Sequence, residues 1–316
     1  MDIQYLLFLQ GIRNSLPHAA EKLAVLISDA GASVVTLVVC CLVYWCLNKE
    51  EGVLFFTALF PAHFVNNLIK QTLCIYRPWI RDARVIPAEG AISGAGGYSF
   101  PSGHTVAASS TFGTGAWLWR KRKRIVSILF GLLIMLIMFS RNFLGVHTPQ
   151  DVLVGMLEGF VMICLAQSFG RWSARHPEKD LKVLLICLAV TAAAVLYLTL
   201  KPYPMDYQDG VLLVDPFDMM KDGMKSSGAF AGLACGWYLE RRLIRFTTDC
   251  GKNEKIMRLT TGLAVLLAGQ VIIKKGFYAL AGELAGGFLY GFCGILLAVF
   301  LIPLMHDAIR KKWFSK

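Results

Sequence analysis

The sequence predicts an all-α protein, a polytopic bundle of transmembrane helices. Of its 316 residues, 56% are hydrophobic and only 17% are charged, whereas a soluble domain is about a quarter charged. Apolar runs of about 20 residues, each long enough to cross a bilayer as a helix, recur along the whole chain. An outer-membrane barrel would need alternating segments of roughly ten residues, which the sequence lacks. The apolar runs therefore predict about nine spans.

The predicted spans are joined by short connections except for two longer loops, 74–100 and 201–223. They cover residues 23–47, 52–73, 101–120, 125–144, 151–170, 181–200, 224–240, 257–279 and 284–306. We expect residues 1–316 to form a single integral membrane domain. Before the first span, Leu6, Leu7, Leu9 and Ile12 could form one face of an interfacial helix.

Basic residues cluster in the connections between spans, and their distribution predicts the orientation. The segments 120–124, 171–182, 240–258 and 310–316 are rich in Lys and Arg, as cytoplasmic loops are. The N-terminus is then outside and the C-terminus inside, which suits a plasma (inner) membrane or an organelle membrane. The net charge of +11 is explained by these loops, so no nucleic-acid partner is expected. The nine scattered cysteines show no zinc or disulfide spacing.

Three cations lie at helix ends on the predicted outer face, which should be poor in positive charge. Lys70 ends the second span, Arg77 follows it, and Arg141 ends the fourth span. Each could separately be an anchor at the membrane surface. Together they would repel one another, and a charge inside a bilayer costs about 2.5–3.5 kcal/mol. A bound polyanion on the extracytoplasmic or lumenal face would resolve both problems.

Two helix starts on the same face carry histidines. Ser102 is predicted to cap the third span, with Gly103 allowing close approach to the backbone, and such a start attracts anions. His104 alone could be a hydrogen-bonded interfacial residue. His147 precedes the fifth span, where Asp151 could be a capping acid or could orient His147. Two histidines beside three cations favour a catalytic site.

Other polar residues have simpler explanations. Glycines at 155 and 159, and at 228, 232 and 236, have the spacing of tightly packed membrane helices. Glu158 would point into the membrane in a buried hydrogen-bonding or packing role. The aspartates of the 201–223 loop could bind a cation, although a solvated loop or lid is favoured.

Three short segments carry the charged residues in a fixed order. KQTLCIYRP (70–78) fits K-x6-R-P, PSGH (101–104) is a second motif, and SRNFLGVHTPQD (140–151) fits S-R-x5-H-x3-D. Together they resemble the signature of the type 2 phosphatidic acid phosphatase superfamily. The resemblance implies a catalytic core over residues 52–170 with the fold of the vanadium haloperoxidases. The nine-span layout looks most similar to the glucose-6-phosphatase and sphingosine-phosphate phosphatase branches. Residues 181–306 are additional spans of unknown role.

The resemblance also implies a role for each matching residue. His147 would attack phosphorus and form a phosphohistidine, while Asp151 would orient it. His104 would protonate the leaving oxygen and then activate water. The phosphate-binding residues implied are Lys70, Arg77, Arg141, Ser102 and Gly103. No acidic cluster accompanies them, so neither an essential metal nor another cofactor is expected.

The expected activity is hydrolysis of a lipid or isoprenoid phosphate monoester or diphosphate at the membrane. Several alternatives stay open: a phosphotransferase that uses the same phosphohistidine, a sugar-phosphate phosphatase, a transporter, or a protein that only binds phospholipid. The charges gather at one face rather than across the midplane, which favours an enzyme over a transporter. The sequence leaves the substrate and the oligomeric state undetermined.

Overall fold

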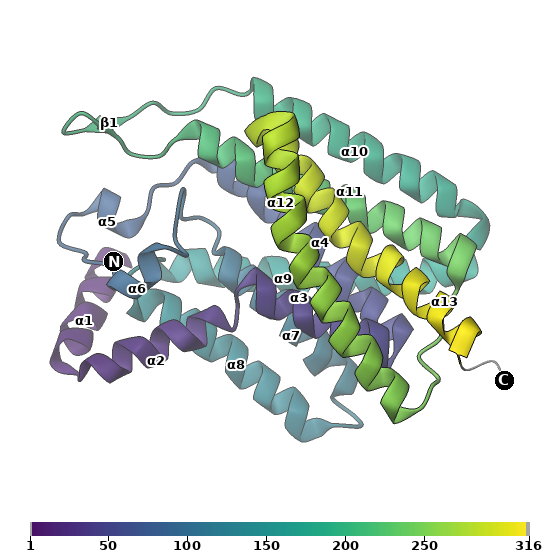
Figure 1. Cartoon of the computed structure of the whole chain (residues 1–316). Coiled ribbons are helices and arrows are strands. Elements are labelled where there is room, and N and C mark those ends of the chain that lie inside the picture. The colour runs from purple at the N-terminus through teal and green to yellow at the C-terminus, as the bar shows by residue number, and fades with distance from the viewer. Residues whose placement is uncertain (1, 314–316) are drawn as a thin grey trace. The chain divides into compact units, whose positions relative to one another are not determined.

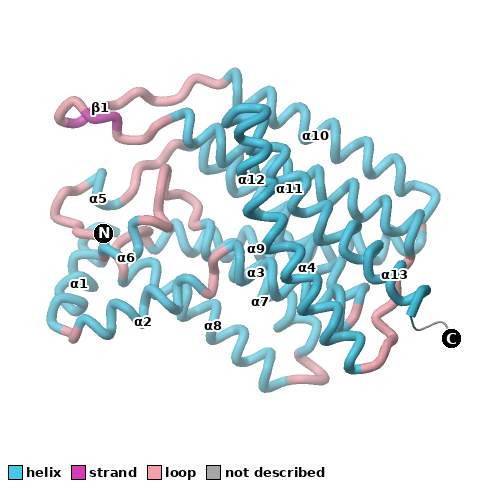
Figure 2. Tube along the Cα trace, viewed as in Figure 1, coloured by secondary structure: helices cyan, strands magenta, loops and turns pink. Residues whose placement is uncertain are grey.

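The computed structural model describes residues 2–313, which fold almost entirely as helices. These residues contain one pair of strands, β1 (Tyr207–Gln208) and β2 (Val211–Leu212). The two strands form an antiparallel hairpin in which Tyr207 lies opposite Leu212. This hairpin is the magenta segment of Figure 2. The predicted all-α class is therefore confirmed. The last predicted basic segment, 310–316, lies partly outside the described residues.

The helices follow one another along the chain, and a long loop that carries the β1–β2 hairpin joins α10 to α11 (Figure 1). The first half contains α1 (Asp2–Ser15), α2 (His18–Asp29), α3 (Ser33–Leu42), η1 (Val43–Leu47), α4 (Lys49–Leu73), α5 (Pro78–Arg81), α6 (Glu89–Ile92), α7 (Gly103–Trp119) and α8 (Arg124–Phe143). The second half contains α9 (Pro149–Arg175), η2 (Pro177–Lys179), α10 (Asp180–Leu200), α11 (Pro216–Leu239), η3 (Glu240–Ile244), α12 (Lys252–Leu296), η4 (Leu297–Leu301) and α13 (Ile302–Trp313).

Fewer helices qualify as membrane spans than the nine predicted. Among the described residues, six helices are long and apolar enough to cross a bilayer, or seven if the bent pair His18–Asp29 and Ser33–Leu47 counts as one span. The pair bends by 48°. All the predicted segments are helical, but α7 has only 17 residues and α11 begins with charged residues that shorten its apolar part. The nine-span count is therefore not confirmed.

Contacts divide the chain into two compact units. Unit 1 contains residues 1–37, 65–164 and 202–219, and unit 2 contains residues 38–64, 165–201 and 220–316. Helices α3, α4, α9 and α11 each contribute residues to both units. All the predicted site residues belong to unit 1.

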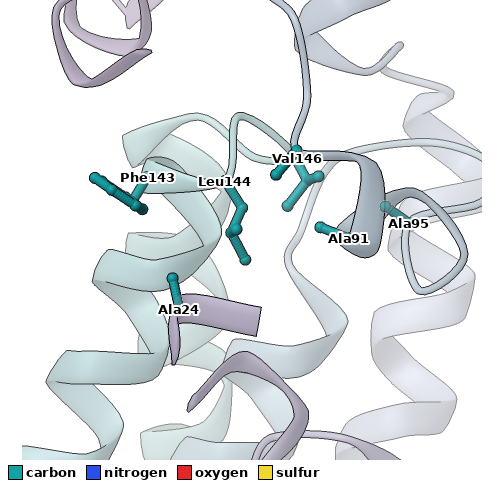
Figure 3. Close-up of a cluster of buried hydrophobic side chains, with 7 residues drawn as sticks. Ala24, Ala91, Ala95, Phe143, Leu144 and Val146 are labelled. Carbon is teal, nitrogen blue, oxygen red and sulfur yellow. The ribbon is translucent and has the colours of Figure 1, made fainter. Parts of the chain in front are cut away.

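In unit 1, helix α8 has α7 along one side and the N-terminal helices α1 and α2 along another (Figure 1). Helix α1 buries Leu6 and Leu9 against the protein, whereas Phe8 and Ile12 are exposed. Leu6 and Leu9 therefore do not share one face with Ile12, and an interfacial position of α1 stays a prediction. A cluster of small and apolar side chains joins α2, α6 and the end of α8, and contains Ala24, Ala88, Ala91, Ala95, Phe143, Leu144 and Val146 (Figure 3).

Helix α9 approaches α7 closely in unit 1 because glycines of α9 face α7. A methyl group at Gly155 would lie 2.9 Å from the carbonyl oxygen of Ser102, and one at Gly159 would lie 2.1 Å from Ser109 Oγ. Both distances are shorter than van der Waals contact. The predicted packing role of these glycines is confirmed.

In unit 2, helix α11 packs on the second half of α12 through its own glycines. Methyl groups at Gly228 and Gly232 would overlap the backbone of Phe288 and Phe292, so this predicted packing stripe is also confirmed. Helix α12 breaks at Gly282, whose φ of 74° favours glycine. The sequence predicted a turn there.

Ion pairs join helix ends within unit 2. Lys49 Nζ lies 2.6 Å from Glu240 Oε1, and Arg241 Nε donates to Asp180 Oδ2 at 2.9 Å. Glu240 and Asp180 are both buried. Buried carboxylates require such partners, because an unpaired buried charge is strongly destabilising.

Candidate active site

The start of helix α9 holds His147 and Asp151 in contact. Thr148 is the N-cap residue: its amide donates to Asp151 Oδ2 at 2.8 Å, and its hydroxyl accepts from the Asp151 amide at 3.4 Å. The same Oδ2 lies 3.3 Å from His147 Nδ1. The two alternatives for Asp151 are therefore compatible, because one carboxylate oxygen caps the helix and contacts the imidazole.

The contacts of His147 assign its tautomer. A carboxylate accepts but cannot donate, so Nδ1 carries the proton that faces Asp151. Arg77 can only donate, and its NH1 lies 2.9 Å from His147 Nε2, so Nε2 presents its lone pair. This nitrogen is the one that a nucleophilic histidine would use.

Arg77 is buried directly before α5, at its N-cap position, and organises the surrounding loops. Its Nε donates to the carbonyl oxygen of Gly97 at 3.1 Å and its NH2 to that of Gly96 at 3.0 Å. Its NH1 also donates to the carbonyl oxygen of Val146 at 2.9 Å. Arg77 thus binds the loop before α7 and the turn that carries His147.

Arg141, near the end of α8, has buried donor nitrogens that make no hydrogen bond. Its NH1 donates to Ser28 Oγ at 2.7 Å, whereas its buried Nε and NH2 have no partner. Asp29 attracts this guanidinium, and Arg77 repels it. A buried guanidinium with unsatisfied donors is costly, and an anion bound there would remove the cost.

Lys70 uses its ammonium group to hold the segment before α7. Its Nζ donates to the carbonyl oxygens of Tyr98, Ser99 and Pro101 at 3.0, 3.2 and 2.9 Å. An ammonium has three donors, so a direct hydrogen bond from Lys70 to a phosphate would replace one of these bonds. Its charge acts on the site in either case.

The start of α7 differs from the prediction in its detail. Ser102 occupies the N-cap position, but its side chain makes no capping hydrogen bond and its hydroxyl accepts from Thr105 Oγ1 at 3.1 Å. The amide of Ser102 donates to the carbonyl oxygen of Asp151 at 3.0 Å, so it is not available to a phosphate. Gly103 begins the helix with room around it, since a methyl group there would lie 3.7 Å from Asn66 Oδ1.

His104 is half-buried on the first turn of α7. A methyl group at Gly94 would lie 3.7 Å from His104 Cε1, so the glycine-rich loop before α7 borders the imidazole. His104 is also near enough to act electrostatically on His147. The structure thus brings the two predicted histidines into one site.

Burial and positive charge keep His147 neutral. His147 lies in the turn between α8 and α9 and is 1% exposed. Burial, followed by the charges of Arg77, Arg141, Lys70 and His104, lowers the pKa of His147 well below its ordinary value. A neutral imidazole surrounded by cations can act as a nucleophile towards an anion.

Two further polar contacts border or join this site. Asn66 Nδ2 donates to Glu158 Oε2 at 3.1 Å, so Glu158 has the buried hydrogen-bonding role that was favoured. Ser99, which sequence reasoning missed, donates from Oγ to Asp151 Oδ2 at 2.5 Å. Nothing in the local pattern marks Ser99, because its partner lies 52 residues away.

Two aspartates of the 201–223 loop make hydrogen bonds within the protein. Asp206 Oδ2 accepts from the Tyr76 hydroxyl at 2.7 Å, and Asp215 Oδ1 accepts from the Phe217 amide at 2.8 Å. Among residues 2–313, no three His, Cys, Asp or Glu side chains are grouped as metal ligands. The two carboxylates thus bond to the protein itself.

Two family models match the chain. The sequence model of the PAP2 superfamily matches residues 51–175, and that of the PAP2 superfamily phosphatase transmembrane extension matches residues 224–312. Residues 51–175 therefore form a PAP2 superfamily domain, and the predicted resemblance is confirmed. The second match also identifies the C-terminal helices as a transmembrane extension found with phosphatases of this superfamily.

The chain is also similar to one individual protein, at low sequence identity. The chain is similar to phosphatidylglycerophosphatase B of Bacillus subtilis (strain 168), with 28% identity over 136 residues. The match covers 41% of this chain and 63% of the relative, so the chain spans less than two thirds of the relative's length. No solved structure is significantly similar to the chain.

Proposed function

We propose that the protein is a membrane phosphatase that hydrolyses a lipid or isoprenoid phosphate monoester or diphosphate. The observation that carries this proposal is the buried Arg141, whose Nε and NH2 lack acceptors, together with a neutral His147 whose Nε2 faces Arg77. Membership of a phosphatase superfamily and the similarity to a lipid phosphatase support the same activity.

In the first step, the lone pair of His147 Nε2 attacks phosphorus, and the bond from phosphorus to the leaving oxygen breaks. His104 donates a proton to that oxygen. The imidazole of His147 gains positive charge, which Asp151 Oδ2 stabilises through Nδ1–H, as an orienting carboxylate does. The product of this step is a phosphohistidine.

In the second step, water replaces the released group, which is an alcohol from a monoester or a monophosphate from a diphosphate. His104, now neutral, accepts a proton from water as the water oxygen attacks phosphorus. The bond between phosphorus and Nε2 breaks, and its electron pair returns to His147. Both histidines regain their starting protonation states, with inorganic phosphate as product.

Three cations would stabilise the charge that develops on the equatorial oxygens of phosphorus. Arg141 has free donors for them, and a guanidinium can bind two oxygens at once. Arg77 could exchange its contact with Nε2 for one with phosphate, which would also release the nucleophile. Lys70 would act mainly through its charge, and the first turn of α7 at Gly103 would add backbone donors.

The lipid character of the substrate is supported by the membrane location of the chain and by the name of its relative. The active site would open on the extracytoplasmic or lumenal face, because the basic loops belong to the other face. We propose a metal-independent reaction, since cations of the protein supply the positive charge. Activity that falls with EDTA and returns with a divalent ion would contradict this part.

A phosphate-release screen tests the proposed function. Purified protein would be offered phosphatidylglycerol phosphate, phosphatidate, a sphingoid-base phosphate, a polyprenyl diphosphate and glucose 6-phosphate. We expect release from lipid substrates and none from the His147→Ala variant at equal expression and thermal stability. Reaction in ¹⁸O-labelled water should place the label in the released phosphate; transfer to another acceptor would leave phosphate unlabelled. Near-normal turnover by His147→Ala would overturn the mechanism.

A further inference from the structure

Ser99 lies where the three signature segments meet, although none of them includes it. Its amide donates to the carbonyl oxygen of Ile75 at 2.7 Å, and its own carbonyl oxygen accepts from Lys70 Nζ at 3.2 Å. Its hydroxyl donates to Asp151 Oδ2 at 2.5 Å. The residue is 1% exposed, so water does not compete for these bonds.

Asp151 Oδ2 contacts three groups: the Thr148 amide at the start of α9, the His147 imidazole and the Ser99 hydroxyl. It accepts from the Thr148 amide at 2.8 Å and lies 3.3 Å from His147 Nδ1. Ser99 Oγ also lies 3.4 Å from that Nδ1. The serine contact is the shortest of the three to Oδ2, and hydrogen bonds to an ionised oxygen are strong. Two fixed donors, the Thr148 amide and the Ser99 hydroxyl, hold the carboxylate in place.

We infer that Ser99 is a positioning residue for the nucleophile His147 and acts through Asp151. The inference rests on the proposed function and adds a residue to it. By donating to Oδ2, Ser99 keeps this oxygen turned towards Nδ1. The proton then stays on Nδ1, and the lone pair stays on Nε2, where phosphorus would arrive.

The same contact predicts how pH dependence changes when the hydroxyl is removed. Asp151 would then present more negative charge to Nδ1–H, and the imidazolium form of His147 would become easier to reach before substrate binds. The nucleophile would be lost at a higher pH than in the unmodified protein. The charged and titratable groups that face His147 are Lys70 of α4, Arg77 after α4, His104 of α7, Arg141 of α8 and Asp151 of α9, and none of them changes in this variant.

The test compares Ser99→Ala and Ser99→Thr with a matched serine. Ser110 is also fully buried, and its hydroxyl bonds only to carbonyls of its own helix, so Ser110→Ala should leave activity unchanged. We expect Ser99→Ala to lower kcat by about 10- to 100-fold, the range for a hydrogen bond to a charged group. KM should change little, and the acidic limb of the pH–rate profile should move to higher pH. Ser99→Thr keeps the hydroxyl and should restore both.

Two outcomes would overturn the inference. One is a Ser99→Ala variant with the kcat and pH profile of the unmodified protein. The other is a Ser99→Thr variant that is folded by thermal unfolding yet as slow and as shifted as Ser99→Ala. The same assay includes the unmodified protein and His147→Ala. Activity that is lost in His147→Ala but kept in Ser99→Ala refutes only the role of Ser99, whereas an inactive unmodified protein refutes the proposed function as well.

Discussion

Arg141 and His147 show how burial determines chemistry at the scale of a single residue. Both side chains are 1% exposed, but one keeps two donors without acceptors while the other is held neutral. The unpaired buried donors of Arg141 are unfavourable by themselves, and the phosphate that we propose to bind there would supply acceptors for them. Titratable groups that burial and neighbouring charges perturb are typical of functional sites.

Arg141 gives the first prediction at this scale. Replacing it with Gln removes the charge and most donors, and should lower kcat/KM by roughly 10²–10³-fold, as loss of a group that stabilises a transition state does. Replacing it with Lys should restore only part of the activity, because lysine lacks the planar fork. Steady-state kinetics measure both. Arg84→Gln is the control, since Arg84 is exposed and pairs with Asp82; equal losses in both variants would refute the role of Arg141.

The neutral state of His147 predicts how stability depends on pH. Because its folded pKa is depressed, protons bind His147 more readily in the unfolded chain. Stability should therefore fall as pH drops below the unfolded value of about 6.5. The thermal midpoint between pH 7.5 and 5.5 should fall further in the unmodified protein than in His147→Gln. An equal fall in both proteins would show that His147 does not titrate in this way.

At the scale of elements, the spacing of α7 and α9 brings the motif residues together. Gly155 lets α9 approach the carbonyl of Ser102, and the Ser102 amide donates to the carbonyl oxygen of Asp151. The close helix contact and the active site are thus built from the same residues. A change in helix spacing should therefore affect catalysis as well as stability.

Gly155→Ala tests this connection. Its methyl group would lie 2.9 Å from backbone that cannot yield easily, and overpacking of this kind costs about 1–3 kcal/mol. We expect a lower thermal midpoint and slower phosphate release. Gly131→Ala on α8 is the matched control, because a methyl group there meets no atom within 4 Å and alanine favours the helix. If both alanine variants behave alike, the spacing argument fails.

At the scale of the whole molecule, the site residues belong to unit 1, while the matched transmembrane extension belongs to unit 2. The single-domain organisation and the orientation in the membrane stay predictions. The orientation depends on the loop charges and on the assumption that the basic connections lie on one side. The active site would then face away from the cytoplasm.

Cysteine labelling tests the orientation. Gln208 lies in the exposed hairpin, and Glu178 lies in a basic connection with its side chain 63% exposed. In intact cells, a membrane-impermeant maleimide should label Gln208→Cys but label Glu178→Cys only after permeabilisation. The unmodified protein measures the background from its own cysteines. The reverse pattern would place the active site on the cytoplasmic face.

The sequence by itself determined the helical class, the glycine packing stripes and the residues that gather at the candidate site. These features are local: apolar runs predict helices, glycine spacing predicts close packing, and the Thr148–Asp151 pattern predicts a helix start. The count of nine spans is not confirmed, because α7 and α11 are helices of borderline length or polarity.

Only the tertiary structure decided how each polar group is used. Lys70 donates to backbone carbonyl oxygens. The Ser102 amide donates to the carbonyl oxygen of Asp151, and the Ser99 hydroxyl donates to the carboxylate of the same residue. These contacts join distant segments, and the sequence pattern of one segment carries no information on which donor of another lies nearest. The physical reason is that close packing assigns each buried donor to an acceptor only after the helices have met.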